Sequence, residues 1–155
     1  MRSSMRNIVW LGSLSLVLLG CGGSDQPAPA AGTAAAVEET ADLETLLASA
    51  DVKRGETLYF QCRACHTVEQ DGTNKVGPKL WGMFGREAGA VPGFAYSDAL
   101  KNSGVVWTPE TVNDWLEQPA DFLPGNIMVF VGVKKPQDRA NLIAYLQVEA
   151  NRPVD

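Results

Sequence analysis

Apolar residues recur at helical spacing near the middle and near the end of the chain, and they predict its two longest helices. The first is expected from about Asp51, a good N-cap residue, to Ala64. The second is expected to begin near Pro136. Gly55 leaves room for the close approach of another backbone. The apolar positions are Leu58, Tyr59 and Cys62 in the first helix, and Leu142, Ile143, Tyr145 and Leu146 in the second.

Capping residues predict two shorter helices between these two. One covers residues 97–103 and ends at Gly104. The other opens with Thr108-Pro109-Glu110, which supplies a cap, a proline at the first helical position and an acid in the first turn, and it should stop at Pro119. Residues 66–96 contain Gly and Pro and have no sustained period, which predicts a long loop.

The N-terminus has the pattern of an export signal. Arg2 and Arg6 precede a 12-residue apolar run, Ile8 to Leu19, which is too short to cross a bilayer comfortably. Leu18-Leu19-Gly20-Cys21 resembles the bacterial lipobox, in which the cysteine is lipidated and becomes the new N-terminus. We therefore expect residues 1–20 to be a lipoprotein signal peptide and Cys21 to carry the lipid. The alternative is a short buried helix with an ordinary core cysteine.

Residues 21–50 are expected to be the lipidated cysteine and a flexible linker. Residues 22–37 are low in complexity and nearly free of large apolar side chains, so they cannot form a core. Thr40 could cap a short helix with Leu43, Leu46 and Leu47 on one face. The pattern leaves open whether this helix packs on the domain or is frayed chain.

Composition and charge narrow the classes of function. The chain has 155 residues, 45% of them hydrophobic, which predicts one globular core. Its 13 Lys and Arg against 18 Asp and Glu give a net charge of −5, which leaves no basic surface for nucleic acid. Residues 51–155 contain 11 basic and 13 acidic residues, a net charge of −2, so most of the acidity precedes this segment.

Cys62-Arg63-Ala64-Cys65-His66 is the C-x-x-C-H pattern of covalent c-type haem attachment. Two thiols one helical turn apart can add to two vinyl groups of one haem, and the adjacent imidazole can reach the iron. A zinc site would need four soft ligands, but once Cys21 carries a lipid the chain keeps two cysteines and its single histidine, His66. A thioredoxin-like dithiol would need a βαβ pattern, which is absent.

A second iron ligand is expected from a methionine. Met1 and Met5 belong to the expected signal peptide, which leaves Met83 and Met128. Met83 follows Leu80-Trp81-Gly82 and fits a hydrophobic filler, whereas Met128 lies in an irregular loop after a polar turn. We therefore predict His66 and Met128 as the two iron ligands, the alternative for either methionine being a place in the core.

From about residue 51 to residue 146 the chain resembles class I cytochrome c of the mitochondrial type and its bacterial relatives. The resemblance implies an all-α fold of about four or five short helices, with long loops wrapped around one covalent haem c, in a domain of residues 51–155. The matching segments are 62–68, 77–86, 93–99, 107, 124–130, 134–135 and 142–146.

The resemblance also implies roles for residues outside the haem motif. The carbonyl of Pro78 should accept a hydrogen bond from the ring N–H of His66, the nitrogen that does not face the iron. Arg86, Tyr96 and Trp107 should bind the haem propionates. The last helix should cross the first near Gly55.

Some positions depart from the mitochondrial pattern. Trp115 stands where a tyrosine usually lies near the methionine sulfur, and Leu100 replaces an asparagine. Ala120, Asp121 and Ile127 occupy usual lysine positions around the haem edge. We therefore expect a docking face that is less positive than in relatives.

The resemblance implies electron transfer, and the expected lipid on Cys21 would tether the carrier to a membrane on the bacterial periplasmic side. Single electrons would pass from a quinol-oxidising complex to an oxidase, a reductase or a photosynthetic centre. The competing class, a haem peroxidase or gas sensor, needs an open axial position and a distal acid–base group, usually His. Because His66 is the single histidine, an electron carrier rather than an enzyme is expected.

Overall fold

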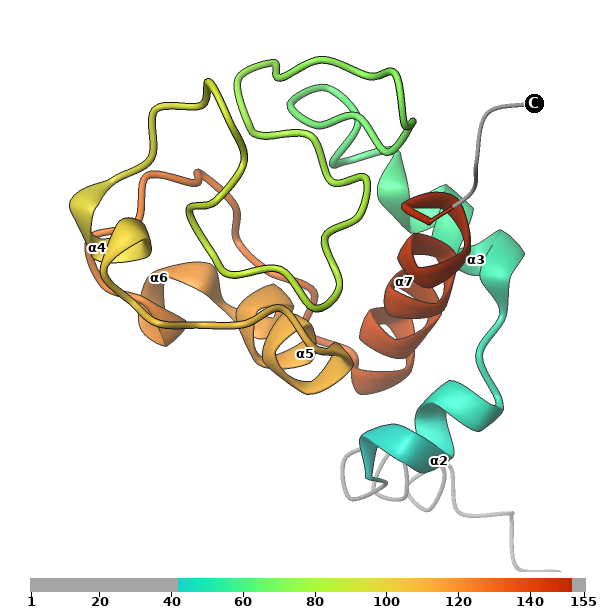
Figure 1. Ribbon diagram of the computed structural model, residues 1–155. Helices are drawn as coiled ribbons and strands as arrows, with labels where there is room; N and C mark the ends of the chain where they lie inside the picture. Colours follow the sequence, from blue (N-terminus) through green and yellow to red (C-terminus); the bar gives the residue numbers. More distant parts are fainter. Residues whose placement is uncertain (1–41, 152–155) are drawn as a thin grey trace, which may run out of the picture. The chain divides into compact units, whose positions relative to one another are not determined.

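The structure, a computed structural model, describes residues 42–151 (Figure 1). The expected signal peptide and Cys21 lie outside these residues. The helices of this part are α2 (Leu43–Ala48), α3 (Val52–Tyr59), α4 (Asp98–Lys101), α5 (Pro109–Glu117), α6 (Pro119–Phe122) and α7 (Pro136–Glu149). An isolated bridge between Glu87 and Val106 is the one strand-like pairing between residues 42 and 151, so the predicted all-α class is confirmed.

The crossing of α3 and α7 is the most extensive contact between helices in residues 42–151. Asp51 caps α3 as predicted, since its carboxylate accepts from the main-chain N–H groups of Lys53 and Arg54 at 2.9 and 3.1 Å. Gly55 faces α7, where a Cβ would lie 2.1 Å from the carbonyl oxygen of Asn141. A side chain at position 55 would therefore force the two helices apart.

Helix α3 ends earlier than the sequence suggests, at Tyr59 rather than near Ala64. After Tyr59 the chain forms tight turns, in which the N–H groups of Cys65 and His66 both donate to the Cys62 carbonyl at 3.0 Å. The haem motif thus lies in these turns, directly after the helix.

The sequence left open whether a helix in residues 41–50 packs on the domain or is frayed chain, and the position of α2 answers this question. Its N-cap is Asp42, whose carboxylate accepts from Thr45 N–H at 2.9 Å; Thr40, the expected cap, lies outside the described residues. Leu46 is buried, and its carbonyl accepts from the Gln137 side chain of α7 at 3.2 Å. The helix is therefore an extension packed on α7, not frayed chain.

Helix α5 begins at the predicted cap, Thr108. Helix α4 lies within the predicted range 97–103 but is shorter, with Ser97 as its N-cap and Lys101 as its last residue. Helix α6 was not predicted, because Pro119 was interpreted only as the end of the preceding helix. A proline also fits the first turn of a new helix, where its missing N–H costs nothing, and Pro119 opens α6 in this way.

The core lies around α7, which contacts α2, α3 and α5. Leu142, Ile143 and Val112 are fully buried there. Arg139 of α7 is also buried, and it donates to Asn113 Oδ1 at 2.8 Å and to the carbonyls of Val133 and Lys134 at 3.0 Å. This arginine therefore ties the chain before α7 to α5.

We predict that Gly55→Ala lowers the free energy of unfolding by about 1–3 kcal/mol, because overpacking at the crossing outweighs the higher helix propensity of alanine. Denaturant unfolding of the haem-loaded protein measures this. Glu56→Ala, at an exposed position of the same helix, is the matched control and should change stability by no more than about 0.5 kcal/mol. Equal stability of the two variants would contradict the close crossing.

Candidate functional site

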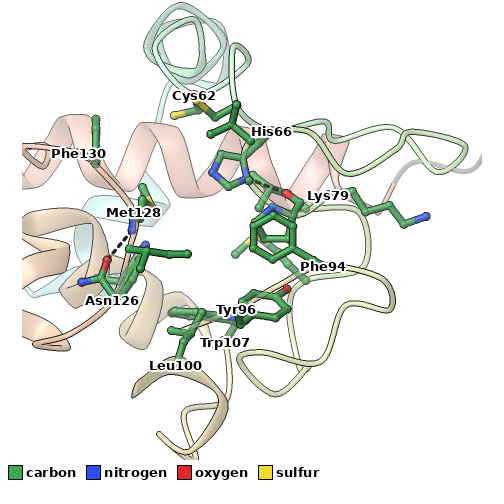
Figure 2. Close-up of a pocket in the computed structure, with 18 of the residues that line it drawn as sticks. Cys62, His66, Lys79, Phe94, Tyr96, Leu100, Trp107, Asn126, Met128 and Phe130 are labelled. Carbon is green, nitrogen blue, oxygen red and sulfur yellow. Dashed lines mark hydrogen bonds between the residues drawn. The ribbon is translucent and has the colours of Figure 1, made fainter. Parts of the chain in front are cut away.

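A cavity of about 350 Å³ opens between the turns after α3, the long loop and the segment before α7 (Figure 2). Its lining contains every residue that the sequence analysis assigned to the site, although these residues span positions 62 to 128 of the chain. They are Cys62, Cys65, His66, Pro78, Arg86, Tyr96, Trp107 and Met128. The fold therefore brings all of them together.

The two cysteines line one wall and are half-buried. Burial, and secondarily the neighbouring Cys65, raises the pKa of Cys62 to about 11, so this thiol is protonated at neutral pH. A redox-active dithiol needs a thiolate for attack. The environment of Cys62 therefore argues against the dithiol alternative.

His66 is held in one orientation by its neighbours. Its Nδ1 lies 2.7 Å from the Pro78 carbonyl oxygen, which can only accept, so Nδ1 carries the proton and Nε2 keeps a free lone pair. Burial lowers the pKa of His66, with a smaller contribution from Lys75, and this favours the neutral ring that ligates metals. Figure 2 shows the free nitrogen directed toward the side of the cavity where Met128 lies.

Gly77 supports the His66 ring in a way that sequence reasoning missed. A Cβ at this position would lie 2.3 Å from the ring carbon Cε1 and 2.7 Å from Nε2. Only glycine lets the backbone lie flat against the imidazole. The signal was present, since Gly77 directly precedes the proline that accepts the histidine proton.

Met128 lies across the cavity from His66 (Figure 2). Its N–H donates to the side-chain oxygen of Asn126 at 2.9 Å. The amide of Asn126 in turn donates to the carbonyls of Pro119 and Leu123, both at 2.8 Å. Asn126, which the sequence analysis did not assign to the site, therefore fastens the methionine segment to α6.

Met83 also lines the cavity, but it belongs to the buried hydrophobic core. Its N–H donates to the Leu80 carbonyl at 3.0 Å in a tight turn. This environment suits the filler role expected for Met83.

The remaining wall carries aromatic side chains and one guanidinium. Trp107 packs edge-to-face on the buried Trp115, with ring centroids 5.4 Å apart. Arg86 donates a hydrogen bond from Nη1 to the Trp81 carbonyl oxygen at 2.9 Å. Burial raises the pKa of Tyr96, so its hydroxyl keeps its proton and can donate.

A protein-family model described as Cytochrome c matches residues 52–148. The chain belongs to the cytochrome c family. A cytochrome c of Gibberella zeae is 47% identical over 102 residues, which cover 65% of this chain and 96% of the relative. A cytochrome c of Sesamum indicum is 49% identical over 98 residues, 63% of this chain and 88% of the relative. A cytochrome c2 of Blastochloris viridis is 46% identical over 100 residues, which cover 64% of this chain and 79% of the relative.

As a member of the cytochrome c family, the protein is an electron carrier rather than an enzyme, and it holds one covalently bound haem c. The cavity fits this group, because it combines two thiols one turn apart, an imidazole nitrogen with a free lone pair and a thioether on the far side. Within residues 42–151, no three His, Cys, Asp or Glu side chains gather as an alternative metal site. The same residues contain no helix with the length and apolar character of a membrane span.

We predict that Asn126→Ala lowers the free energy of unfolding by about 1–3 kcal/mol, because three partly buried main-chain groups lose their partner. Thermal or denaturant unfolding of the haem-loaded protein tests this. The control is Asn102→Ala, which removes an exposed amide. If both substitutions cost the same, Asn126 does not fasten the methionine segment.

Proposed function

We propose that Cys62 and Cys65 bind the haem covalently and that His66 and Met128 ligate its iron from opposite faces. The observation that carries this is the placement of a free His66 nitrogen and the Met128 side chain across one cavity, beside both cysteines. The bound haem supplies an iron that gains and loses single electrons. The side chains around it supply its fixed environment.

Each of these residues is held by a contact of its own. The Pro78 carbonyl accepts the Nδ1 proton of His66, which fixes the ring and strengthens Nε2 as a donor of electron density to a metal. Asn126 holds the main chain of Met128 from the other side. Little rearrangement is therefore needed between oxidation states, which favours fast electron transfer.

With His66 and Met128 both on the iron, the proposed site would leave no position open for substrate or gas, which a peroxidase or gas sensor needs. Substrate or gas could bind the iron only if Met128 left. His66 is the single histidine of the chain and is bonded to Pro78, so it is not available as a distal acid–base group.

Met128→Ala is predicted to keep the haem attached but to open the distal position. The oxidised variant should lose the red absorption band of iron–methionine sulfur ligation, bind cyanide readily and have a lower reduction potential. Met83→Leu, at the other cavity-lining methionine, should keep the band. Loss of the band in the Met83 variant, with retention in the Met128 variant, would reverse the ligand assignment.

For the haem propionates we propose Arg86, Tyr96 and Trp107 as partners. All three line the same cavity. Arg86 keeps guanidinium N–H groups beyond those used on the Trp81 and Lys79 carbonyls, and Tyr96 has a protonated hydroxyl. These groups can donate to a carboxylate.

We further propose that the protein works on the periplasmic side of a bacterial membrane, anchored through a lipid on Cys21. The lipobox-like sequence before Cys21 supports this, and so does the position of residues 1–51 outside the family match. Its redox partners in this proposal are a quinol-oxidising complex as donor and an oxidase, reductase or photosynthetic centre as acceptor.

The anchor has a direct test by expression of the full chain in a bacterium fed labelled palmitate. We expect label and membrane association in the unchanged chain, and loss of both in Cys21→Ser. Ser24→Ala, three residues further on, is the control and should behave like the unchanged chain. An unlabelled wild-type protein would contradict the lipid anchor while leaving the haem site untouched.

A further inference from the structure

A second cavity, of about 530 Å³, lies beside the haem motif, and the main chain of the motif forms part of its wall. It is lined by residues of α3 and α7 and by the loops on either side of His66. Among residues 42–151, His66 is the one residue that lines both this cavity and the haem cavity. Groups in the second cavity can therefore act on a proposed iron ligand from outside the haem cavity.

Three carbonyl groups near the end of the haem motif accept hydrogen bonds from outside it. The chain that leaves a helix has carbonyls without an intrahelical partner, and these need other donors. The N–H of Gly77 donates to the Cys65 carbonyl at 2.8 Å. The ammonium of Lys75 lies 2.9 Å from the Arg63 carbonyl oxygen and 3.5 Å from that of His66. Lys75 thus joins two turns of the motif through one cationic group.

A buried hydroxyl reaches the same His66 carbonyl. Tyr59, the last residue of α3, is 7% exposed, and its hydroxyl donates to the His66 oxygen at 3.1 Å. Its ring packs on Tyr145 of α7, with ring centroids 5.3 Å apart. Burial raises the pKa of Tyr59, so the hydroxyl keeps its proton and remains a donor. The main chain of His66 is therefore tied to the crossing of the two helices.

The ammonium of Lys75 is the charged member of this arrangement. Glu56 and Glu69 line the same cavity, but in residues 42–151 no ion pair includes Lys75. Its charge is therefore directed at main-chain oxygens rather than cancelled by a carboxylate. The positive charge of Lys75 adds to burial in lowering the pKa of His66, so its field reaches the imidazole ring.

We propose that Tyr59 and Lys75 are positioning residues for His66, and that the Lys75 ammonium raises the reduction potential of the iron that His66 binds. The inference rests on the proposed ligation by His66 and Met128. Oxidation adds one positive charge at the iron, and a cation held against the main chain of its ligand disfavours that added charge. The two donors also restrain the main chain of His66, as Pro78 restrains its ring.

The effect of the charge is tested by redox titration of the haem-loaded protein. Lys75→Gln should shift the equilibrium with a reference couple about threefold toward the oxidised form, which is a fall of about 30 mV at about 59 mV per tenfold for one electron. The shift is modest because Lys75 is exposed and water screens its charge. Lys75→Arg keeps a cationic donor and should restore the original potential.

The matched control for this titration is Lys53→Gln. Lys53 is an exposed lysine in the first turn of α3 and does not line the second cavity, so its loss should leave the equilibrium unchanged. An equal fall in both glutamine variants would reduce the effect to net charge and overturn the proposal. An unchanged potential in Lys75→Gln would overturn it as well.

The positioning role is tested by NMR on the ¹³C- and ¹⁵N-labelled, reduced haem-loaded protein. The ¹³C resonance of the His66 main-chain carbonyl should move upfield in Tyr59→Phe and in Lys75→Gln, because each variant removes one donor from that oxygen. Lys53→Gln should leave this resonance in place. A resonance that is unchanged in either of the first two variants would overturn the role of that residue. Loss of the sulfur-ligation band in the unchanged protein would instead contradict Met128 ligation, on which the carbonyl resonance does not depend.

Discussion

The crossing of α3 and α7 at Gly55 is the constraint on which the haem cavity depends. The cysteine and histidine wall follows directly from the end of α3, so its position is set by where α3 lies on α7. The methionine wall depends on α7 as well, because Arg139 binds the carbonyls of Val133 and Lys134 at the end of the methionine segment. The contact of α3 with α7, which only a glycine at position 55 permits, therefore places the segments that carry the proposed iron ligands His66 and Met128.

Each proposed iron ligand is held in place by contacts with neighbouring residues of the cavity wall. His66 is fixed by the Pro78 carbonyl and by the flat backbone of Gly77, and Met128 is fixed through Asn126. Such contacts select one tautomer of the histidine and restrain the methionine segment. An electron carrier benefits from this, because a site that does not rearrange needs little energy to change charge.

The same segment that places Met128 inside the cavity exposes valines outside it, because alternate residues of extended chain face opposite sides. The inner face therefore carries Met128, the proposed iron ligand, and the outer face is exposed. The pairing of Asp121 and Lys134 through Gln118 keeps charge on this outer face balanced. Balanced charge of this kind favours weak electrostatic steering toward this face.

Local signals in the sequence determined the starts of α3, α5 and α7 and the residue types of the site. Asp51 and Thr108 cap their helices through main-chain groups two or three residues away, so the pattern alone predicts them. The C-x-x-C-H motif likewise places two thiols and an imidazole within five residues. The choice of Met128 came from its place in an irregular loop and from the haem motif upstream, whereas the roles of Pro78 and Arg86 came from a family resemblance. The fold placed all three residues around one cavity.

Other features could be known only from the tertiary structure, because they depend on contacts between residues far apart in the chain. The packing of α2 on α7 joins Leu46 to Gln137, 91 residues away, and Arg139 reaches Asn113 across 26 residues. The early end of α3 and the existence of α6 were not predicted, because short helices are too weak on their own for propensity to set their bounds. The residue types with their local hydrogen bonds can be read from the sequence, whereas contacts between distant segments form only when the chain closes around its core.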